Sequence, residues 1–280
     1  MKLSAFGYQP STVSRQRRLS RRRLLAVAAA AIPVPAVLCA AVESWGDLVG
    51  RFVYDGKPPE RKRLVVDKDG ECCGKFDIRD ESLMVGPDGG LANVFVYCRS
   101  PRVAVCPELA KSLPKRVLLD NRDCIFKPHC MAIWFGQQEL HIVNSDPVDQ
   151  NVDFRPTGDA PANIPLPAYH AKKSPDKQVE ATWRFTRQQF TPVLIKCNLH
   201  PWESAHILIR ANPYYGISGA DGTFRIPKLP IGPFEFQLWH ERPGYLDAPG
   251  WPKGRAEVAI GSGTTDLGTI RLAPAALEKT

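Results

Sequence analysis

The chain has 280 residues and a formal net charge of +8, from 37 Lys and Arg against 29 Asp and Glu. Its 26 prolines and 21 glycines leave no long apolar pattern with the helical period, so the composition favours an all-β architecture. No Gly-rich phosphate loop, nucleophile elbow or His-Glu-x-x-His zinc helix occurs, and we therefore expect no enzyme activity.

Residues 1–41 have the pattern of an export signal. Seven basic residues and no acidic residue precede the apolar stretch 24–38. Small residues suitable for cleavage follow it. The segment 20–25 resembles a twin-arginine signal, and an ordinary secretory signal fits equally. The apolar stretch is short and contains two prolines, so a membrane contact is expected only if the segment stays uncleaved. We predict a periplasmic or secreted protein.

Removal of this segment changes the charge of the chain. The seven basic residues leave with it, and the formal net charge falls from +8 to +1. No basic stripe remains, and the cluster 61–63 is flanked by acidic residues. Nucleic acid is therefore excluded as an expected partner.

The mature chain begins with a strand pattern. Residues 46–54 alternate as a strand does, 55–59 read as a turn, and 91–98 form a second candidate core strand. The string Gly-x-Phe-Val-x-Asp-Gly-x-Pro in the first two segments resembles the opening of carboxypeptidase-regulatory-like domains. The resemblance implies a small transthyretin-like β-sandwich.

Seven cysteines follow the signal segment, in a compartment where pairing is the default expectation. Six of them, without Cys197, allow 15 connectivities. We favour one bridge from Cys72 or Cys73 to Cys124, because these residues lie in turn-rich segments able to flank one sheet. The odd total fits a free Cys197, as a thiolate or as an ordinary buried thiol.

The middle of the chain contains a second series of strand patterns. In residues 139–144, alternation places Leu140, Ile142 and Asn144 on one face. Residues 147–167 are polar and rich in proline and are interpreted as a loop. The other candidate strands are 124–129, 131–135, 179–185, 190–197 and 206–210.

An apolar run ends abruptly in Cys197-Asn-Leu-His200-Pro-Trp-Glu203. A thiol and an imidazole three residues apart, in a short loop after a buried strand, are able to hold one soft metal ion. The string resembles the Cys-x-x-His-Pro-x-Met loop of cupredoxins of the amicyanin type, the blue-copper electron carriers. The resemblance implies a Greek-key β-sandwich and copper. It also implies that Cys197 supplies the strong equatorial bond and that His200 is the exposed imidazole.

Two of the four ligand positions implied by this resemblance are altered. Glu203 stands where the weak axial methionine belongs. The segment 144–152 matches the strand that carries the other imidazole, with Gln150 in place of that histidine. An amide oxygen is a poorer donor for copper than an imidazole nitrogen. The candidate metal set is Cys197, His200, Gln150 and Glu203.

Three interpretations of these residues stay open. They hold copper in an atypical centre, or they pack a cupredoxin fold that has lost its metal, and then no cofactor is expected. A third possibility is a zinc set of Cys197, His200, Glu203 and His206. His129 is able to complete a copper set only near Gln150. We interpret His129, His141, His170 and the pair His240-Glu241 as structural.

The last quarter of the chain completes the first resemblance. The turn Asp221-Gly222 predicts a hairpin within 215–226, and 229–239 gives a further turn and strand. Residues 256–260 and 267–272 predict a last hairpin across 261–263. This order predicts a split sandwich (46–111 and 211–275) with a cupredoxin-like domain, residues 112–210, inserted between its halves.

We therefore predict an all-β, exported, cupredoxin-like protein with a degenerate copper site and a non-catalytic binding or structural role in the cell envelope. The alternative is an atypical copper-binding electron-transfer protein that uses Cys197 and His200. The expected partner is a redox or envelope protein.

Overall fold

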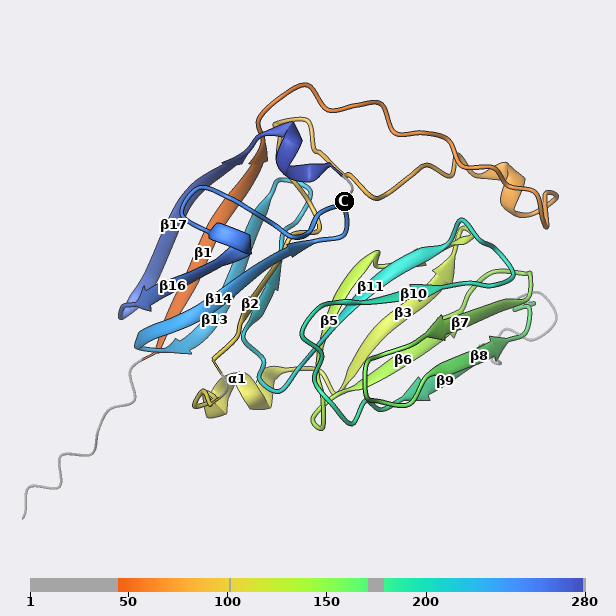
Figure 1. Ribbon diagram of the computed structural model, residues 1–280. Coiled ribbons are helices and arrows are strands. Elements are labelled where there is room, and N and C mark those ends of the chain that lie inside the picture. Colours follow the sequence, from red (N-terminus) through yellow and green to blue (C-terminus); the bar gives the residue numbers. More distant parts are fainter. Residues whose placement is uncertain (1–44, 101, 171–178, 279–280) are drawn as a thin grey trace, which may run out of the picture. The chain divides into compact units, whose positions relative to one another are not determined.

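The computed structural model describes residues 45–100, 102–170 and 179–278 (Figure 1). The predicted signal segment, residues 1–41, lies outside the described residues. The described chain consists mainly of β-strands in several sheets, so the predicted all-β fold class is confirmed. No helix within the described residues is long and apolar enough to cross a membrane.

The strands divide into two groups that come from different parts of the chain. In Figure 1 one group is coloured orange to amber and blue, and the other runs from yellow through green to turquoise. We call the first group the first sandwich. It contains β1 (Trp45–Tyr54), β2 (Phe95–Cys98), β12 (Tyr215–Ile217), β13 (Thr223–Pro230), β14 (Gly232–His240), β15 (Gly244–Tyr245), β16 (Arg255–Ile260) and β17 (Gly263–Leu272).

The other group, the second sandwich, is formed by consecutive strands from the middle of the chain. It contains β3 (Arg116–Arg122), β4 (Ile125–Lys127), β5 (Cys130–Trp134), β6 (Glu139–Asn144), β7 (Gln150–Phe154), β8 (Ala162–Leu166), β9 (Val179–Trp183), β10 (Val193–Lys196) and β11 (Ser204–Arg210). The short helices are η1 (Cys73–Lys75), α1 (Pro107–Ser112), η2 (Pro252–Gly254) and η3 (Pro274–Leu277).

In the first sandwich, β13, β1 and β17 form one sheet, and β12, β2, β14 and β15 form the other, with β16 beside β14. Strand β1 is the centre of its sheet, antiparallel to β13 and parallel to β17. Its alternation buries Leu48 and Phe52, which join Val96 of β2 and Phe236 of β14 in one apolar core. Each sheet therefore contributes its apolar face to the same interior.

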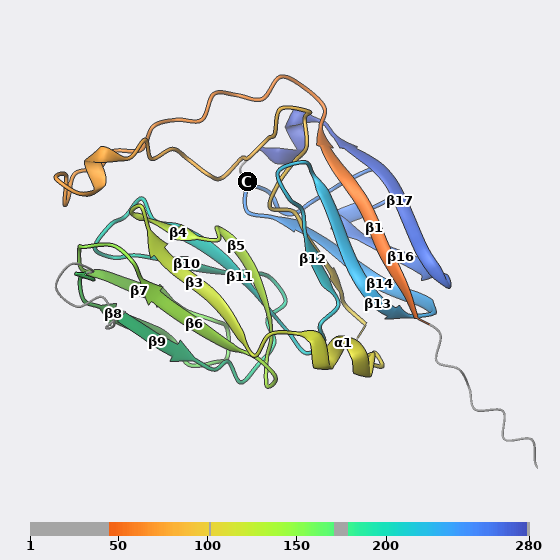
Figure 2. The same cartoon turned by 180° about the vertical axis from the view of Figure 1, so that it is seen from behind.

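Both predicted hairpins of the first sandwich are wrong in their pairing. The turn at Asp221-Gly222 separates β12, which pairs with β2, from β13, which pairs with β1 (Figure 2). The turn at 261–263 likewise separates β16, beside β14, from β17, beside β1. Each turn carries the chain from one sheet to the other. The two strands that it joins then cover the same core from opposite sides.

The second sandwich places the sheet β4-β3-β6-β9 against the sheet β5-β11-β10-β7-β8. Leu140, Ile142 and Asn144 of β6 are all fully buried, as their alternation predicts. The predicted loop 147–167 is wrong, since it contains β7 and β8, paired from Gln150–Leu166 to Phe154–Ala162. Val152 and Phe154 of β7 are both buried in the core of the second sandwich, and their burial outweighs the effect of the prolines.

The two sandwiches share a buried contact. Phe95, Tyr97 and Trp239 of the first sandwich pack with Cys130 and Leu208 of the second. The buried guanidinium of Arg210 donates to the backbone oxygens of Gln189 and Cys98 at 2.9 and 3.0 Å, and lies 5.1 Å from the centre of the Tyr97 ring. Apolar packing and the hydrogen bond from the Arg210 side chain to the Cys98 backbone oxygen therefore hold β11 against β2.

A disulfide joins Cys73 to Cys124, one of the two predicted alternatives. Cys73 lies in the turn-rich segment between β1 and β2, and Cys124 in the turn between β3 and β4. Cys72, Cys98, Cys106, Cys130 and Cys197 are free. The bridge ties a loop of the first sandwich to the end of the second sandwich that contains the predicted site.

Candidate functional site

Strand pairing brings residue 150 to the predicted ligand loop. Cys197 directly follows β10, and β10 is antiparallel to β7, which begins at Gln150. The loop closes on itself, because the backbone N–H of Glu203 donates to the oxygen of His200 at 2.9 Å. Glu203 directly precedes β11, so two neighbouring strands fix both ends of the loop.

All four predicted residues meet, in a group that we call the amide site (Gln150, Cys197, His200, Glu203). The side-chain oxygen of Gln150 lies 2.7 Å from His200 Nδ1 and accepts from the Cys197 thiol at 3.3 Å. The Gln150 amide nitrogen donates to Glu203 Oε1 at 3.1 Å. His200 Nδ1 is 3.7 Å from Cys197 Sγ and 3.4 Å from Glu203 Oε1.

Asn151 supports this loop, a role that the sequence pattern did not predict. Its side-chain oxygen accepts from the backbone N–H groups of Asn198 and Leu199, at 2.8 and 3.2 Å, and lies 3.4 Å from Cys197 Sγ. The asparagine follows Gln150 on β7, and its hydrogen bonds go to the backbone at the start of the loop instead of to His200 or Glu203. Asparagine side chains often form hydrogen bonds with the backbone of a tight loop. This tendency is the only signal in the sequence that could have indicated the role of Asn151.

Glu203 supplies the carboxyl group of the amide site. Its side chain is fully buried, and Oε2 has no hydrogen-bond partner within the described residues. Burial raises the pKa of Glu203 to about 8, against the hydrogen bond from Gln150, which lowers it. Burial also raises the pKa of the Cys197 thiol. Both groups are therefore mainly protonated at neutral pH.

The expected exposure of His200 is wrong, because its side chain is 0% exposed. Asp69, from the loop that the disulfide anchors, contacts His200 Nε2 at 2.8 Å. The Trp202 ring lies 5.0 Å from the His200 ring, and its N–H donates to the Cys124 oxygen at 3.0 Å. A distant loop covers the imidazole that the resemblance places at the surface.

The amide site does not fit a copper ion as it stands. It contains one imidazole, and both nitrogens of His200 already face oxygen atoms. The Gln150 oxygen takes the position between thiol and imidazole where a shared ion belongs. Hydrogen bonds through Gln150 thus connect the four side chains, and only Glu203 Oε2 has no partner among the described residues, at the place where a trigonal copper set requires two imidazoles and a thiolate.

The structure forms a second group of donors whose members have different predicted roles: His129 and Glu241 were interpreted as structural, Cys130 as a candidate for disulfide pairing, and His206 as part of an alternative zinc set. We call it the histidine cluster (His129, Cys130, His206, Glu241). The donor atoms of His129, Cys130 and His206 all lie within 4.8 Å of one another. Glu241 Oε1 is 2.6 Å from His129 Nε2, and Oε2 is 3.9 Å from His206 Nδ1. His206 therefore belongs here and not to a zinc set with Cys197.

Burial and charge oppose each other in the histidine cluster. Burial lowers the pKa of His206 to about 4 and raises the pKa of the Cys130 thiol well above its usual value. Burial also acts to lower the pKa of His129, but the Glu241 carboxylate outweighs it and the pKa is raised. The hydrogen bond from His129 lowers the pKa of Glu241 although burial opposes it. His129 and Glu241 thus form a buried ion pair beside a neutral imidazole.

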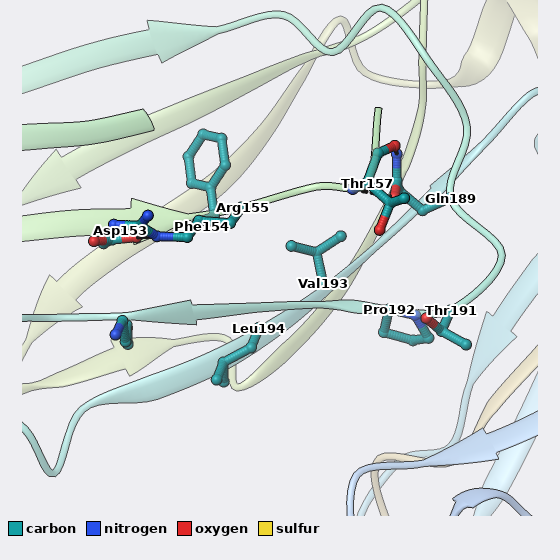
Figure 3. A pocket seen from close by; sticks show the side chains of 10 residues that line it. Asp153, Phe154, Arg155, Thr157, Gln189, Thr191, Pro192, Val193 and Leu194 are labelled. Atoms are coloured by element: carbon teal, nitrogen blue, oxygen red, sulfur yellow. Dashed lines mark hydrogen bonds and ion pairs between the residues drawn. The ribbon is translucent and has the colours of Figure 1, made fainter. Parts of the chain in front are cut away.

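Two pockets lie on the second sandwich. One, of about 480 Å³, borders the amide site and is lined by Asp149, Gln150, Asn151, Asn163, Pro165, Leu166, Pro167, Asn198 and Leu199. Figure 3 shows the other, of about 330 Å³, lined by Asp153, Phe154, Arg155, Thr157, Gln189, Thr191, Pro192, Val193, Leu194 and Lys196. The second pocket contains no residue of either donor group, so the first is the better candidate for ligand binding.

Comparison with known proteins gives a structural likeness for part of the chain. No protein-family model matches the sequence, and no curated protein matches it. Solved structures of amicyanin are similar, among them one mutant in the Cu(I) form and two oxidized mutants. Each has a TM-score of 0.28 and 14% identity, over 41% of this chain and 98% of the amicyanin chain. The resemblance of the first sandwich to carboxypeptidase-regulatory-like domains stays a prediction.

Proposed function

We propose that this chain is an exported, non-catalytic protein of the cell envelope, in which a cupredoxin-like domain is inserted into a transthyretin-like sandwich. Its former copper position is a hydrogen-bonded polar group, and its role is binding or structural. The signal pattern of residues 1–41 supports export. The order of strands supports the insertion, since β3 to β11 form sheets only with one another.

One observation carries the proposal. The Gln150 side chain accepts from His200 and Cys197 through its oxygen and donates to Glu203 through its nitrogen. A buried amide with partners on both ends stabilises the folded loop, whereas displacing it leaves buried polar atoms without partners. The adjoining 480 Å³ pocket gives this end of the sandwich room for a ligand.

Copper titration tests the proposal. We expect the purified protein to take up no copper through Cys197, and therefore to show no intense thiolate-to-copper band that Cys197→Ser removes. Cys130→Ser is the matched control, because it removes the thiol of the histidine cluster and leaves Cys197 in place. A band and one bound copper per chain that depend on Cys197 would contradict the proposal.

That result would instead support the alternative, electron transfer by an atypical copper centre. One observation favours this alternative, since Glu203 Oε2 is buried without a hydrogen-bond partner in the described part of the chain, and an ion is one way to satisfy it. The centre would need Gln150 to leave its place between Cys197 and His200.

The double variant Gln150→His, Glu203→Met is the sharper test. It supplies the second imidazole and the thioether of the resembling loop, and removes the amide that separates Cys197 from His200. We expect one copper per chain and an intense visible band in this variant, lost again on adding Cys197→Ser. Thermal unfolding checks that the variant is folded. A folded double variant without the band would show that the loop is not a lapsed copper site.

A further inference from the structure

The histidine cluster results from strand register across the two sandwiches. Strands β5 and β11 are parallel neighbours in which Cys130 is opposite His206. The backbone N–H of His206 donates to the backbone oxygen of His129 at 2.8 Å. These two pairings place His129, Cys130 and His206 together. Glu241 belongs to the first sandwich, where it directly follows β14. Donors from three separate segments therefore converge at one point, and of these only His206 belongs to the stretch of chain that contains Cys197 and Glu203.

The donor atoms have the spacing of a slightly open metal site. Ligand atoms about 2.0–2.3 Å from a tetrahedral zinc ion lie roughly 3.5 Å apart. Here the two imidazole nitrogens and the Cys130 sulfur lie within 4.8 Å of one another, and Glu241 Oε2 lies 3.9 Å from His206 Nδ1. Small side-chain rotations thus suffice to surround an ion.

Two features of the imidazoles suit ligation. His206 Nδ1 is buried and has no hydrogen-bond partner within the described residues, although Glu241 lies near it. His129 Nδ1 is 3.1 Å from the Ser204 backbone oxygen, so it is placed to donate there and to leave Nε2 for the centre of the cluster. A metal-ligating histidine normally has this arrangement, with its second nitrogen held by a carbonyl or carboxylate.

The charges of the donors match a divalent ion. One thiolate and one carboxylate bring two negative charges, and two neutral imidazoles bring none, so a divalent ion balances the charge of these four donors. The Glu81 carboxyl lies outside the set, 3.7 Å from His129 Nδ1. Binding displaces the Cys130 thiol proton and the proton shared by His129 and Glu241 to solvent, with no change of oxidation state. A cavity of about 140 Å³, lined in part by Glu81, Ser204 and Glu241, adjoins the cluster at Glu241.

We propose that His129, Cys130, His206 and Glu241 bind one divalent transition-metal ion, with zinc the best match to a closed tetrahedral set of two nitrogens, one sulfur and one oxygen. The ion joins the two sandwiches, because three ligands belong to the second sandwich and one to the first. The site is independent of the amide site and of the function proposed for it.

Zinc uptake by the purified protein tests the proposal. We expect about one zinc per chain after chelation, reloading and dialysis, and a visible thiolate charge-transfer band when cobalt(II) replaces zinc. Cys130→Ser and His206→Gln are expected to weaken binding by more than the roughly 10–100-fold that loss of an outer-shell partner costs. Thermal unfolding of each variant without metal checks that it is folded.

Matched controls locate the ion. Cys197→Ser removes the thiol of the amide site, and His141→Gln removes a histidine paired with Glu180 on β9. Both are expected to bind zinc as the unmodified protein does. The proposal is overturned by a folded protein that takes up neither zinc nor cobalt, by uptake unaffected in Cys130→Ser and His206→Gln, or by uptake lost in Cys197→Ser.

Discussion

Replacing Glu203 by glutamine is expected to remove a large part of the pH dependence of stability between about pH 4.5 and 8. Burial raises the pKa of this carboxyl from 4.5 to about 8 in the folded chain. The folded state therefore holds the proton more tightly than the unfolded state does. This stabilisation is fully present below pH 4.5 and is lost as the pH rises through 8.

The expected size is several kcal/mol at most, since a shift of this size at about 1.4 kcal/mol per unit corresponds to roughly 5 kcal/mol. Urea unfolding of both proteins between pH 4.5 and 8.5 measures it. Below about pH 6.5, buried His206 and His240 oppose this fall because burial lowers the pKa of each to about 4, so the comparison is made above that pH. From about pH 6.5 to 8.5 the free energy of unfolding should fall with pH more steeply in the unmodified protein than in Glu203→Gln. Glu257→Gln, at an exposed position of β16, is the control and should keep the steep slope. Equal slopes in all three proteins would refute the assignment to Glu203.

Removing the disulfide with Cys73→Ala and Cys124→Ala is expected to lower the free energy of unfolding by about 4 kcal/mol, the chain-entropy value for a loop of this length. The two cysteines are 51 residues apart. The loss includes a local effect, because the backbone N–H of Cys73 donates to the oxygen of Asp69, the residue that covers His200. Without the bridge, we expect His200 to become accessible.

Urea unfolding of the double variant and of the reduced unmodified protein measures this loss, and histidine modification at residue 200 reports the exposure. Cys72→Ser is the matched control, because Cys72 is next to the bridge and is free. It should unfold as the unmodified protein does. A reduced protein that is as stable as the oxidized one would contradict the predicted contribution of the bridge.

Strand positions were predictable where alternation is strong, and strand partners were not. The patterns at 46–54 and 139–144 correspond to β1 and β6. The turns at Asp221-Gly222 and 261–263 also occur, but each joins two sheets instead of two paired strands. A turn reports local reversal of the chain, whereas pairing depends on which apolar face is covered, and that is a property of the whole sandwich.

The amide site was likewise predictable only in part. The loop motif and the segment 144–152 were sufficient to predict that Gln150, Cys197, His200 and Glu203 meet. The burial of His200 was not predictable, because Asp69 covers it from 131 residues away in the sequence. The hydrogen bonds that place the Gln150 oxygen between thiol and imidazole also follow from that closed geometry.

The sequence by itself determined the all-β class and the alternation of the strands, since both depend on neighbours within a few positions, and the resemblance of two segments to cupredoxins named the four residues of the amide site. Only the tertiary structure decided that His129, Cys130 and His206 converge on Glu241. Their positions depend on the parallel register of β5 with β11 and on the contact between the sandwiches. Long-range packing, with no local signal in the chain, sets both.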